Sequence, residues 1–256
     1  MEVVFTDLDG TLLDTQTYSF EAARPALERL RRTARPLVFT TSKTRAEVEL
    51  WRRRTTNRHP FIFENGAAVA IPPGYFPFPA PERIEFGAPY SALVQALERA
   101  ERRSGCRVRS FHHMSAGEVA AACGLPLDQA VLAKQREFDE PFEVLEGCVE
   151  KLTQALEAQG LRWTRGGRFH HVLGASDKAR AVTELTALYR RAYRDVRTIG
   201  LGDGWNDLDF LRVVDLPVII ASPHSAELAA ALPRARVTET PAPEGWNHVL
   251  LEMIPE

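Results

Sequence analysis

Short apolar runs alternate with amphipathic segments in two parts of the chain, residues 1–80 and 174–256. The apolar runs cover residues 3–5, 37–39, 61–63 and 199–201. A 3.6-residue period predicts helices between them, over residues 21–32 and again through Val182, Leu185, Leu188 and Tyr189. Alternating strands and helices are typical of βαβ units around a parallel sheet. We therefore expect both parts to form one α/β core, a Rossmann-like doubly wound sheet whose ligands bind at the carboxyl ends of the strands.

Two carboxylates, Asp7 and Asp9, stand where the first apolar run ends, and Gly10 permits a tight turn after them. Buried like charges repel one another unless a cation or a proton neutralises them. An ordinary Asp-Gly turn is the alternative that needs no chemistry. Catalysis would explain both acids, one as a nucleophile and its neighbour as a general acid/base, with a divalent cation between them.

The second apolar run is followed by Thr41, Ser42 and Lys43. A hydroxyl and a backbone N–H at such a strand end can bind a phosphoryl oxygen. Thr44 and Glu47 then form a predicted capping box, and the N-terminus of the helix that it opens favours an anion.

Lys178 lies at the start of another predicted helix, with Ser176 or Asp177 as its cap. A lysine at this end opposes the helix dipole unless an anion is nearby. The chain has only four lysines, and two of them, Lys43 and Lys178, fall in these strand-end segments. We interpret Lys178 as a phosphate-binding residue; the alternative is a solvated surface lysine.

The last apolar run leads into Gly202-Asp203-Gly204-Trp205-Asn206-Asp207. Glycines let the backbone approach a ligand closely, and carboxylates supply oxygen ligands to a hard cation. An acidic helix N-terminus would account for Asp207 alone. It would not account for Asp203 or for its flanking glycines.

These four segments, in this order, resemble the motifs of the haloacid dehalogenase superfamily of phosphotransferases. The resemblance implies a phosphatase in which Asp7 attacks phosphorus and Asp9 protonates the leaving group. It also implies Mg²⁺ held by Asp7, Asp203 and the backbone carbonyl of Asp9. Asp207 would contact the metal directly or through a neighbour. The remaining implied residues bind or orient the phosphoryl group: Thr41, Ser42, Lys43, Lys178 and Asn206.

Residues 81–173 differ in character, because strand-like pieces there mix irregularly with helices near 89–103 and 149–159. The Pro-rich stretch 71–81 before them breaks regular structure and predicts a hinge or boundary. We expect residues 81–173 to form an inserted α+β cap that closes over the site and selects the substrate. Glu64-Asn65-Gly66-Ala67 resembles a motif of the branch with a type IIB cap, although a simple glycine turn explains it equally well.

The cap segment 135–142 crowds charged residues around two aromatic ones. Arg136 is suited to a carboxylate, and Gln135 and Glu140 to sugar hydroxyls; a charged ribbon with one solvated face is the alternative. This segment, Thr41-Ser42-Lys43 and residues 166–171 resemble the mannosyl-3-phosphoglycerate phosphatase family. That resemblance implies 2-(α-D-mannosyl)-3-phosphoglycerate as the substrate. It adds Gly167 and Arg168 to the candidate substrate-binding residues.

The composition bounds the remaining possibilities. A net charge of -2 over 256 residues predicts no nucleic-acid or membrane partner, and the sequence contains neither an apolar run near 18 residues nor a signal peptide. Three cysteines without zinc spacing predict buried free thiols in a reducing, cytoplasmic compartment. The oligomeric state cannot be predicted. The histidine pairs at 112–113 and 170–171 are expected to be surface or hydrogen-bonding residues, because neighbours on a strand face opposite sides.

Three alternatives to the implied function remain open at this stage. Two are enzymes: another sugar-phosphate phosphatase of the same branch, or a phosphomannomutase, whose Asp-x-Asp motif is the same. The third is a non-catalytic relative that only binds ligands. The presence of Asp7, Asp9, Lys178 and Asp203 argues against the third.

Overall fold

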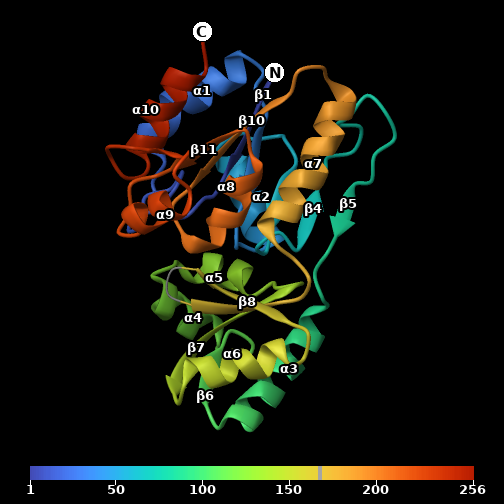
Figure 1. The fold of residues 1–256 in the computed structure, drawn as a ribbon, viewed down its shortest axis with the longest axis vertical. Helices are drawn as coiled ribbons and strands as arrows, with labels where there is room; N and C mark the ends of the chain where they lie inside the picture. Colours follow the sequence, from blue (N-terminus) through green and yellow to red (C-terminus); the bar gives the residue numbers. More distant parts are fainter. Residues whose placement is uncertain (167–168) are drawn as a thin grey trace.

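The computed structural model describes residues 1–166 and 169–256, and it contains two sheets (Figure 1). The large sheet has the order β12-β11-β10-β1-β2-β3-β4-β5. Its strands are β1 (Glu2–Thr6), β2 (Leu37–Thr40), β3 (Phe61–Phe63), β4 (Ala68–Ala70), β5 (Arg83–Glu85), β10 (Arg197–Gly202), β11 (Leu216–Ile219) and β12 (Arg236–Val237). All neighbouring pairs from β12 to β3 are parallel, whereas β4 and β5 add antiparallel strands at one edge. The expected α/β core is confirmed.

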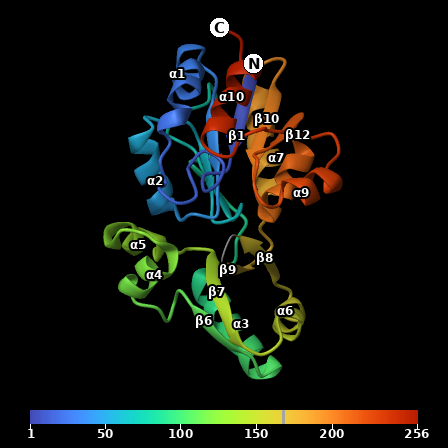
Figure 2. The ribbon, with the colours of Figure 1, turned by 90° about the vertical axis from the view of Figure 1, so that its left-hand side faces the viewer.

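Helices cover both faces of the large sheet (Figure 2). One face carries η1 (Glu21–Ala23), α1 (Arg24–Arg32), α2 (Arg45–Arg54) and α10 (Glu244–Met253). The other carries α7 (Lys178–Ala192), α8 (Leu208–Val213) and α9 (Ser225–Ala231). Side chains alternate across a strand, so Val4 of β1 packs with Trp246 on the first face and Phe5 packs with Tyr189 on the second. These two apolar layers fix the sheet that presents the strand ends.

The smaller sheet has the order β6-β7-β9-β8 and is antiparallel throughout. Its strands are β6 (Arg107–Ser110), β7 (Asp139–Glu146), β8 (Arg162–Gly166) and β9 (Phe169–Leu173). Its helices are α3 (Tyr90–Ser104), α4 (Ala116–Cys123), α5 (Leu127–Ala133) and α6 (Val149–Glu157). Helices α3 and α6 bury Leu93, Leu97 and Leu152 against this sheet, and α5 contacts α2 of the core. We call residues 90–173 the cap.

The boundary expected at residue 81 is wrong, because β5 (Arg83–Glu85) belongs to the large sheet. It pairs with β4, and residues 71–82 form the loop that joins these two strands. The Pro-rich stretch is therefore neither hinge nor boundary. Its Phe76 is buried, and the ring of Phe76 lies 5.2 Å from that of Tyr189 on α7. The chain instead passes between core and cap just before α3 and between β9 and α7.

The predicted helix caps are confirmed, while two helices of the cap were not predicted. The Thr44 side chain accepts a hydrogen bond from the Glu47 backbone N–H, and the Glu47 carboxylate accepts one from the Thr44 backbone N–H. The Asp177 side chain caps α7. Helices α4 and α5 are short, and their sequences lack a clear apolar period. The capping box formed by Ser115 and Glu118 was the available signal for α4.

The cysteines and the helices test two expectations drawn from composition, that the thiols are buried and that no segment spans a membrane. The three cysteines form no disulfide within residues 1–166 and 169–256: Cys106 is buried as expected, Cys123 is half-buried, and Cys148 is exposed. The expectation of buried thiols is therefore wrong for Cys148. Among the described residues, no helix is both long enough and apolar enough to cross a membrane.

Candidate active site

Three carboxylates meet at the carboxyl edge of the large sheet. Strands β1 and β10 are parallel neighbours in which Thr6 pairs with Leu201, so the residues that follow each strand lie side by side. Asp7 follows β1, Asp203 follows β10, and Asp207 ends the short helix η2 (Trp205–Asp207). Each of the three acids offers an oxygen within 4.8 Å of the others. The structure thus brings together three of the four predicted metal-binding residues; Asp9, predicted to contribute its backbone carbonyl, is not among these side-chain ligands.

Two glycines make this convergence possible. Gly10 has φ +76°, and a Cβ there would lie 2.5 Å from Asp203 Oδ2. A Cβ on Gly202 would lie 2.5 Å from Asp207 Cβ. The Thr11 hydroxyl donates to Asp203 Oδ1 at 2.8 Å. Any larger residue at these two glycines would therefore displace an acid of the cluster.

Lys178, the first residue of α7, supplies a buried cation to these acids. Its Nζ donates to Asp7 Oδ1 at 2.8 Å and to Asp207 Oδ1 at 2.6 Å. Burial alone would lower the pKa of Lys178, but Asp207 and Asp7 outweigh it and raise that pKa. The unfavourable position of a lysine at a helix N-terminus is thus offset by two carboxylates.

One lysine does not neutralise three acids, of which two are buried and Asp203 is half-buried. Burial raises the pKa of Asp7 well above its ordinary value; Lys178 lowers that pKa, and Asp207 and Asp203 raise it further. Burial and repulsion from Asp207 likewise raise the pKa of Asp203 to about 7. A divalent cation bound to these oxygens would relieve the excess negative charge. The residues present therefore fit a metal ion.

Asp9 lies apart from the three acids, with its side chain 43% exposed, and it pairs with Lys43. Lys43 Nζ lies 2.8 Å from Asp9 Oδ2 and 3.7 Å from Glu47 Oε1. Burial would lower the pKa of Lys43, yet Asp9 and Glu47 raise it. The sequence predicted that Lys43 binds phosphate, but in this structure its ammonium group holds the Asp9 carboxylate.

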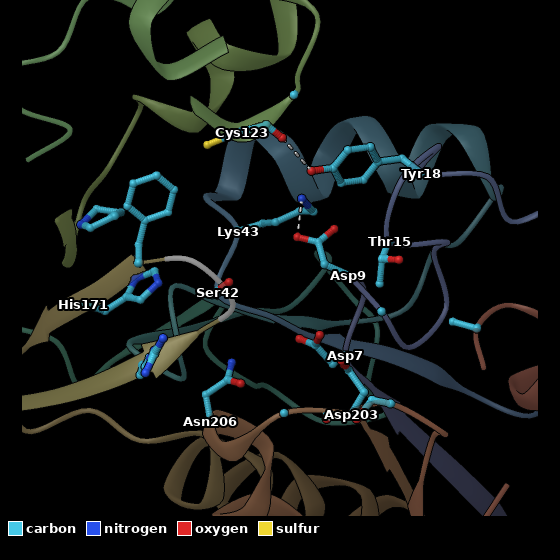
Figure 3. A pocket seen from close by; sticks show the side chains of 18 of the residues that line it. Asp7, Asp9, Thr15, Tyr18, Ser42, Lys43, Cys123, His171, Asp203 and Asn206 are labelled. Atoms are coloured by element: carbon cyan, nitrogen blue, oxygen red, sulfur yellow. Dashed lines mark hydrogen bonds and ion pairs between the residues drawn. The ribbon is translucent and has the colours of Figure 1, made fainter. Parts of the chain in front are cut away.

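These residues open onto a cavity of about 1180 Å³ between core and cap (Figure 3). The predicted residues that line it are Asp7, Asp9, Ser42, Lys43, Arg136, Asp203 and Asn206. Thr41 is buried beneath this surface, where its hydroxyl accepts a hydrogen bond from the Lys43 backbone N–H at 3.2 Å. The cavity exceeds what a phosphate needs, so it has room for a substantial leaving group.

The cap residues predicted to select the substrate have different environments. Arg136 lines the cavity; its Nη1 donates to the Ser42 carbonyl at 2.8 Å and its Nε to the Ala133 carbonyl at 3.0 Å. Gln135 is exposed and does not line the cavity. Glu140 is fully buried, accepts a hydrogen bond from the His112 backbone N–H at 2.8 Å, and also lies away from the cavity. Gly167 and Arg168 lie outside the described residues.

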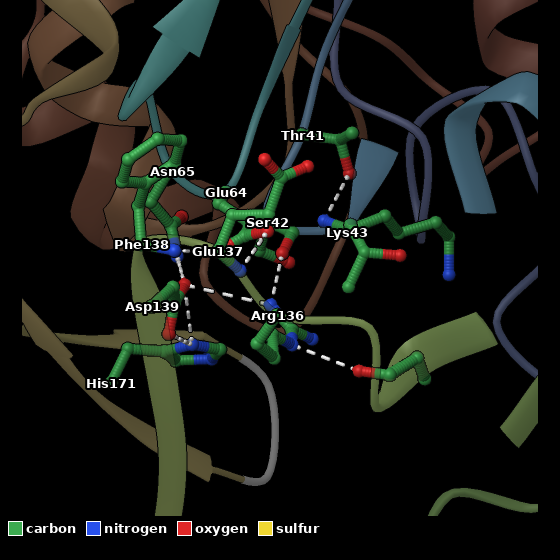
Figure 4. A network of polar contacts seen from close by, with 12 residues as sticks. Thr41, Ser42, Lys43, Glu64, Asn65, Arg136, Glu137, Phe138, Asp139 and His171 are labelled. Atoms are coloured by element: carbon green, nitrogen blue, oxygen red, sulfur yellow. Dashed lines mark hydrogen bonds and ion pairs between the residues drawn. The ribbon is translucent and has the colours of Figure 1, made fainter. Parts of the chain in front are cut away.

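A polar network that was not predicted from the sequence joins cap and core (Figure 4). Glu64 and Asn65 follow β3 in left-handed conformations, with φ +47° and +55°. The Glu64 carboxylate accepts hydrogen bonds from the backbone N–H groups of Glu137, at 3.0 Å, and Phe138, at 2.6 Å. Asn65 Nδ2 donates to Asp139 Oδ2 at 2.7 Å. Glu64 and Asn65 therefore connect the cap to the core through hydrogen bonds. The sequence alone could not distinguish this segment from a simple glycine turn.

Glu64→Gln should change how stability depends on pH. Burial raises the pKa of Glu64 from an ordinary 4.5 to about 8. Protonated Glu64 thus stabilises the fold fully below about pH 4.5, and this contribution is lost as pH rises through about 8. At about 1.4 kcal/mol per pH unit, its upper limit is on the order of 5 kcal/mol. Glutamine mimics the protonated acid, so the Tm of the variant should gain on that of wild type as pH rises.

Thermal unfolding of both proteins between about pH 5 and pH 9 measures this effect. Glu137→Gln is the matched control, because Glu137 is the neighbouring acid in the same junction but is 31% exposed. Its Tm should follow wild type across the range. Parallel curves for wild type and Glu64→Gln would show that Glu64 does not titrate in this way.

The two histidine pairs lie in different environments, and neither belongs to a cluster of potential metal ligands among residues 1–166 and 169–256. His112 and His113 are exposed. His171 is buried with its Nδ1 2.8 Å from Asp139 Oδ1, whereas His170 stacks on Phe142 on the other side of β9, with ring centroids 5.5 Å apart. Asp139 and His171 are site residues that sequence reasoning did not select.

The comparisons with known proteins agree with this fold and this arrangement of acids. A family model described as haloacid dehalogenase-like hydrolase matches residues 4–75. A solved structure of a subclass IIB sugar phosphatase of that superfamily superimposes with a TM-score of 0.68 at 17% identity, covering 99% of this chain and 98% of its own. Fold and site thus define the class of protein, a haloacid dehalogenase-like hydrolase.

Two curated relatives narrow this class to one family. A glucosyl-3-phosphoglycerate/mannosyl-3-phosphoglycerate phosphatase of Methanococcoides burtonii is 40% identical, over 98% of this chain and 97% of the relative. A mannosyl-3-phosphoglycerate phosphatase of Pyrococcus furiosus is 36% identical, over 86% and 91%. The chain belongs to the family of mannosyl-3-phosphoglycerate phosphatases. The matched region includes the cap as well as the core.

Proposed function

We propose that this protein is a Mg²⁺-dependent phosphatase that hydrolyses 2-(α-D-mannosyl)-3-phosphoglycerate to mannosylglycerate, a compatible solute, and phosphate in the cytoplasm. The observation that carries the proposal is the cluster of Asp7, Asp203, Asp207 and Lys178 beside a cavity that lies between core and cap. Relatives with this activity in their names match cap and core together, which supports the same substrate here.

The reaction begins with attack of an Asp7 carboxylate oxygen on phosphorus, which gives an aspartyl-phosphate and releases the sugar-glycerate oxygen. Asp9 gives this oxygen a proton and later takes one from the water that hydrolyses the aspartyl-phosphate. Asp9 suits both steps because it lines the same cavity as Asp7 and is held in position by Lys43. Hydrolysis restores Asp7 and releases phosphate.

The phosphoryl group carries negative charge that the site must offset during transfer. Lys178 contributes one fixed positive charge beside Asp7. Ser42 and Asn206 line the cavity at this level, and Thr41 supports the loop below. Mg²⁺ would be held by Asp7, Asp203, the Asp9 carbonyl and, directly or through a neighbour, Asp207, and when bound it would neutralise and orient the phosphoryl oxygens.

The substrate carboxylate needs a further cation away from the phosphate site. Arg136 lines the cavity and its Nη2 has no hydrogen bond to another described residue, so we propose that it binds the carboxylate. Gln135 and Glu140 are not proposed as direct contacts, because neither lines the cavity. Arg165 of β8, which does line it, is a second candidate that the sequence did not suggest.

A panel of phosphate esters assayed for released phosphate tests the proposal. We expect kcat/KM for mannosyl-3-phosphoglycerate to exceed that for 3-phosphoglycerate, mannose 6-phosphate and sucrose 6-phosphate by about 100-fold or more. A site built for both carboxylate and sugar leaves polar groups unpaired when either is missing, at about 1–3 kcal/mol per group. Glucosyl-3-phosphoglycerate differs at one hydroxyl, so discrimination against it should be weak.

Two results would contradict this proposal. A plain hexose phosphate that proves the better substrate would indicate a general sugar phosphatase on the same core. Transfer of the phosphoryl group back to the sugar, without release of free phosphate, would indicate a mutase.

A further inference from the structure

The cap contributes a mixed apolar and polar wall to the cavity. Phe111 and Phe169 line this wall, and their rings meet edge to face with centroids 5.0 Å apart. His171 lines the same cavity from β9, and Figure 3 shows it across the cavity from Asp7. Aromatic faces beside a few fixed polar atoms are typical of sites for small polar ligands such as sugars.

His171 is held in one orientation by a buried carboxylate. Its Nδ1 lies 2.8 Å and 3.0 Å from the two oxygens of Asp139, which is completely buried. Burial opposes ionisation of Asp139, but His171, Arg136 and Asn65 together hold its pKa below the ordinary value. A carboxylate only accepts hydrogen bonds, so Nδ1 carries a proton and Nε2 is the ring nitrogen left to contact a ligand. Nε2 has no hydrogen bond to another described residue.

The same carboxylate ties His171 to the catalytic loop. Asn65 Nδ2 donates to Asp139 at 2.7 Å, and Asn65 Oδ1 lies 3.5 Å from Nδ2 of Asn206 beside the acid cluster. Arg136 Nη1 lies 3.7 Å from Asp139 on the cavity side (Figure 4). Asp139, a buried acid of the cap, has no part in the phosphoryl-transfer steps, so its burial needs another explanation. Orienting His171 toward a ligand accounts for an acid that is costly to bury.

We propose that His171 is a specificity-determining residue whose Nε2 forms a hydrogen bond with a hydroxyl of the glycosyl group, and that Asp139 positions it. This inference rests on the proposed function and names which part of the substrate the cap wall contacts. A hydroxyl can donate to Nε2 or accept from it, and the aromatic faces of Phe111 and Phe169 on the same wall suit a sugar ring rather than the glycerate carboxylate.

Two variants of His171 test the contact. His171→Leu removes the polar ring nitrogen, whereas His171→Gln keeps a polar amide near the position of Nε2. His170→Gln is the matched control, because His170 is the adjacent histidine on the opposite side of β9 and does not line the cavity. For each protein, kcat and KM are measured on mannosyl-3-phosphoglycerate, 3-phosphoglycerate and 4-nitrophenyl phosphate, and folding is checked by thermal unfolding.

In His171→Leu, kcat/KM for the glycosyl substrate should fall about tenfold or more relative to the other two substrates, chiefly through KM. His171→Gln should recover part of that loss, Asp139→Asn should shift the ratio in the same direction, and His170→Gln should leave it unchanged. Equal losses on all three substrates would overturn the proposal in favour of a structural role for the network. Matching losses on both glycerate substrates would place the carboxylate at His171 and overturn it as well.

The proposed function is tested separately, by the substrate preference of the wild-type enzyme. If wild type prefers a hexose phosphate, the same ratios are measured on that ester against 4-nitrophenyl phosphate. A selective loss in His171→Leu would then still support a sugar contact, and an unselective one would overturn it.

Discussion

Replacing Asp7 with asparagine is expected to lower phosphatase activity at least about 100-fold, or ~2.7 kcal/mol in the barrier, while the protein stays folded. An amide cannot form the aspartyl-phosphate, although its oxygen can still accept the hydrogen bond from Lys178. Burial and the neighbouring acids raise the pKa of Asp7, so ionised Asp7 opposes folding at neutral pH when no metal is bound. The Tm of the variant in chelator should therefore equal or exceed that of wild type.

Asp14→Asn is the matched control for this experiment. Asp14 also lines the cavity, and its Oδ1 accepts hydrogen bonds from Gln16 and Thr17, which asparagine can preserve. Its activity should stay near that of wild type. If folded Asp7→Asn retains more than about one per cent of wild-type activity, Asp7 is not the nucleophile. A large fall in its Tm would contradict the electrostatic argument instead.

The acid cluster could be predicted from sequence because each of its parts is local. Asp7 and Asp203 directly follow apolar runs, and in a parallel sheet the carboxyl ends of such runs share one edge. Lys178 was recognisable because a lysine beside a capped helix N-terminus is unfavourable on its own. Because the carboxyl ends of parallel strands share one edge, residues that are far apart in the chain could be assigned to one site.

The junction between core and cap could not be predicted in this way. Asp139 looked like one charge among several in a ribbon, yet it is fully buried because Asn65, Arg136 and His171 converge on it from other elements. Such burial depends on how the two sheets pack relative to each other, and the local hydrophobic period of a sequence carries no information about that packing. The prediction of a hinge or boundary at the Pro-rich stretch was wrong for a related reason. Prolines do interrupt regular structure there, but Phe76 anchors the loop to α7.

Removal of divalent metal is expected to lower activity at least about 100-fold, and added Mg²⁺ should restore it. The physical reason is the excess charge of the cluster, where Lys178 pairs with the buried Asp7 and Asp207 and a third carboxylate, the half-buried Asp203, lies close by. Bound Mg²⁺ should also raise the Tm of wild type, since a ligand that binds only the folded state stabilises it. Unfolding curves at increasing Mg²⁺ concentration measure this effect without reference to turnover.

Asp203→Asn separates this metal site from a general effect of ionic strength. Asparagine keeps an acceptor for the Thr11 hydroxyl but removes one of the charges that the cation would neutralise. The Mg²⁺ concentration for half-maximal activity should rise about tenfold or more, and the Mg²⁺-dependent gain in Tm should shrink. Asp209→Asn is the control, because Asp209 lies two residues after Asp207 but is 53% exposed and pairs with Arg212. If Asp203→Asn and Asp209→Asn respond to Mg²⁺ alike, the cation acts elsewhere and the assignment of the acid cluster as its site is wrong.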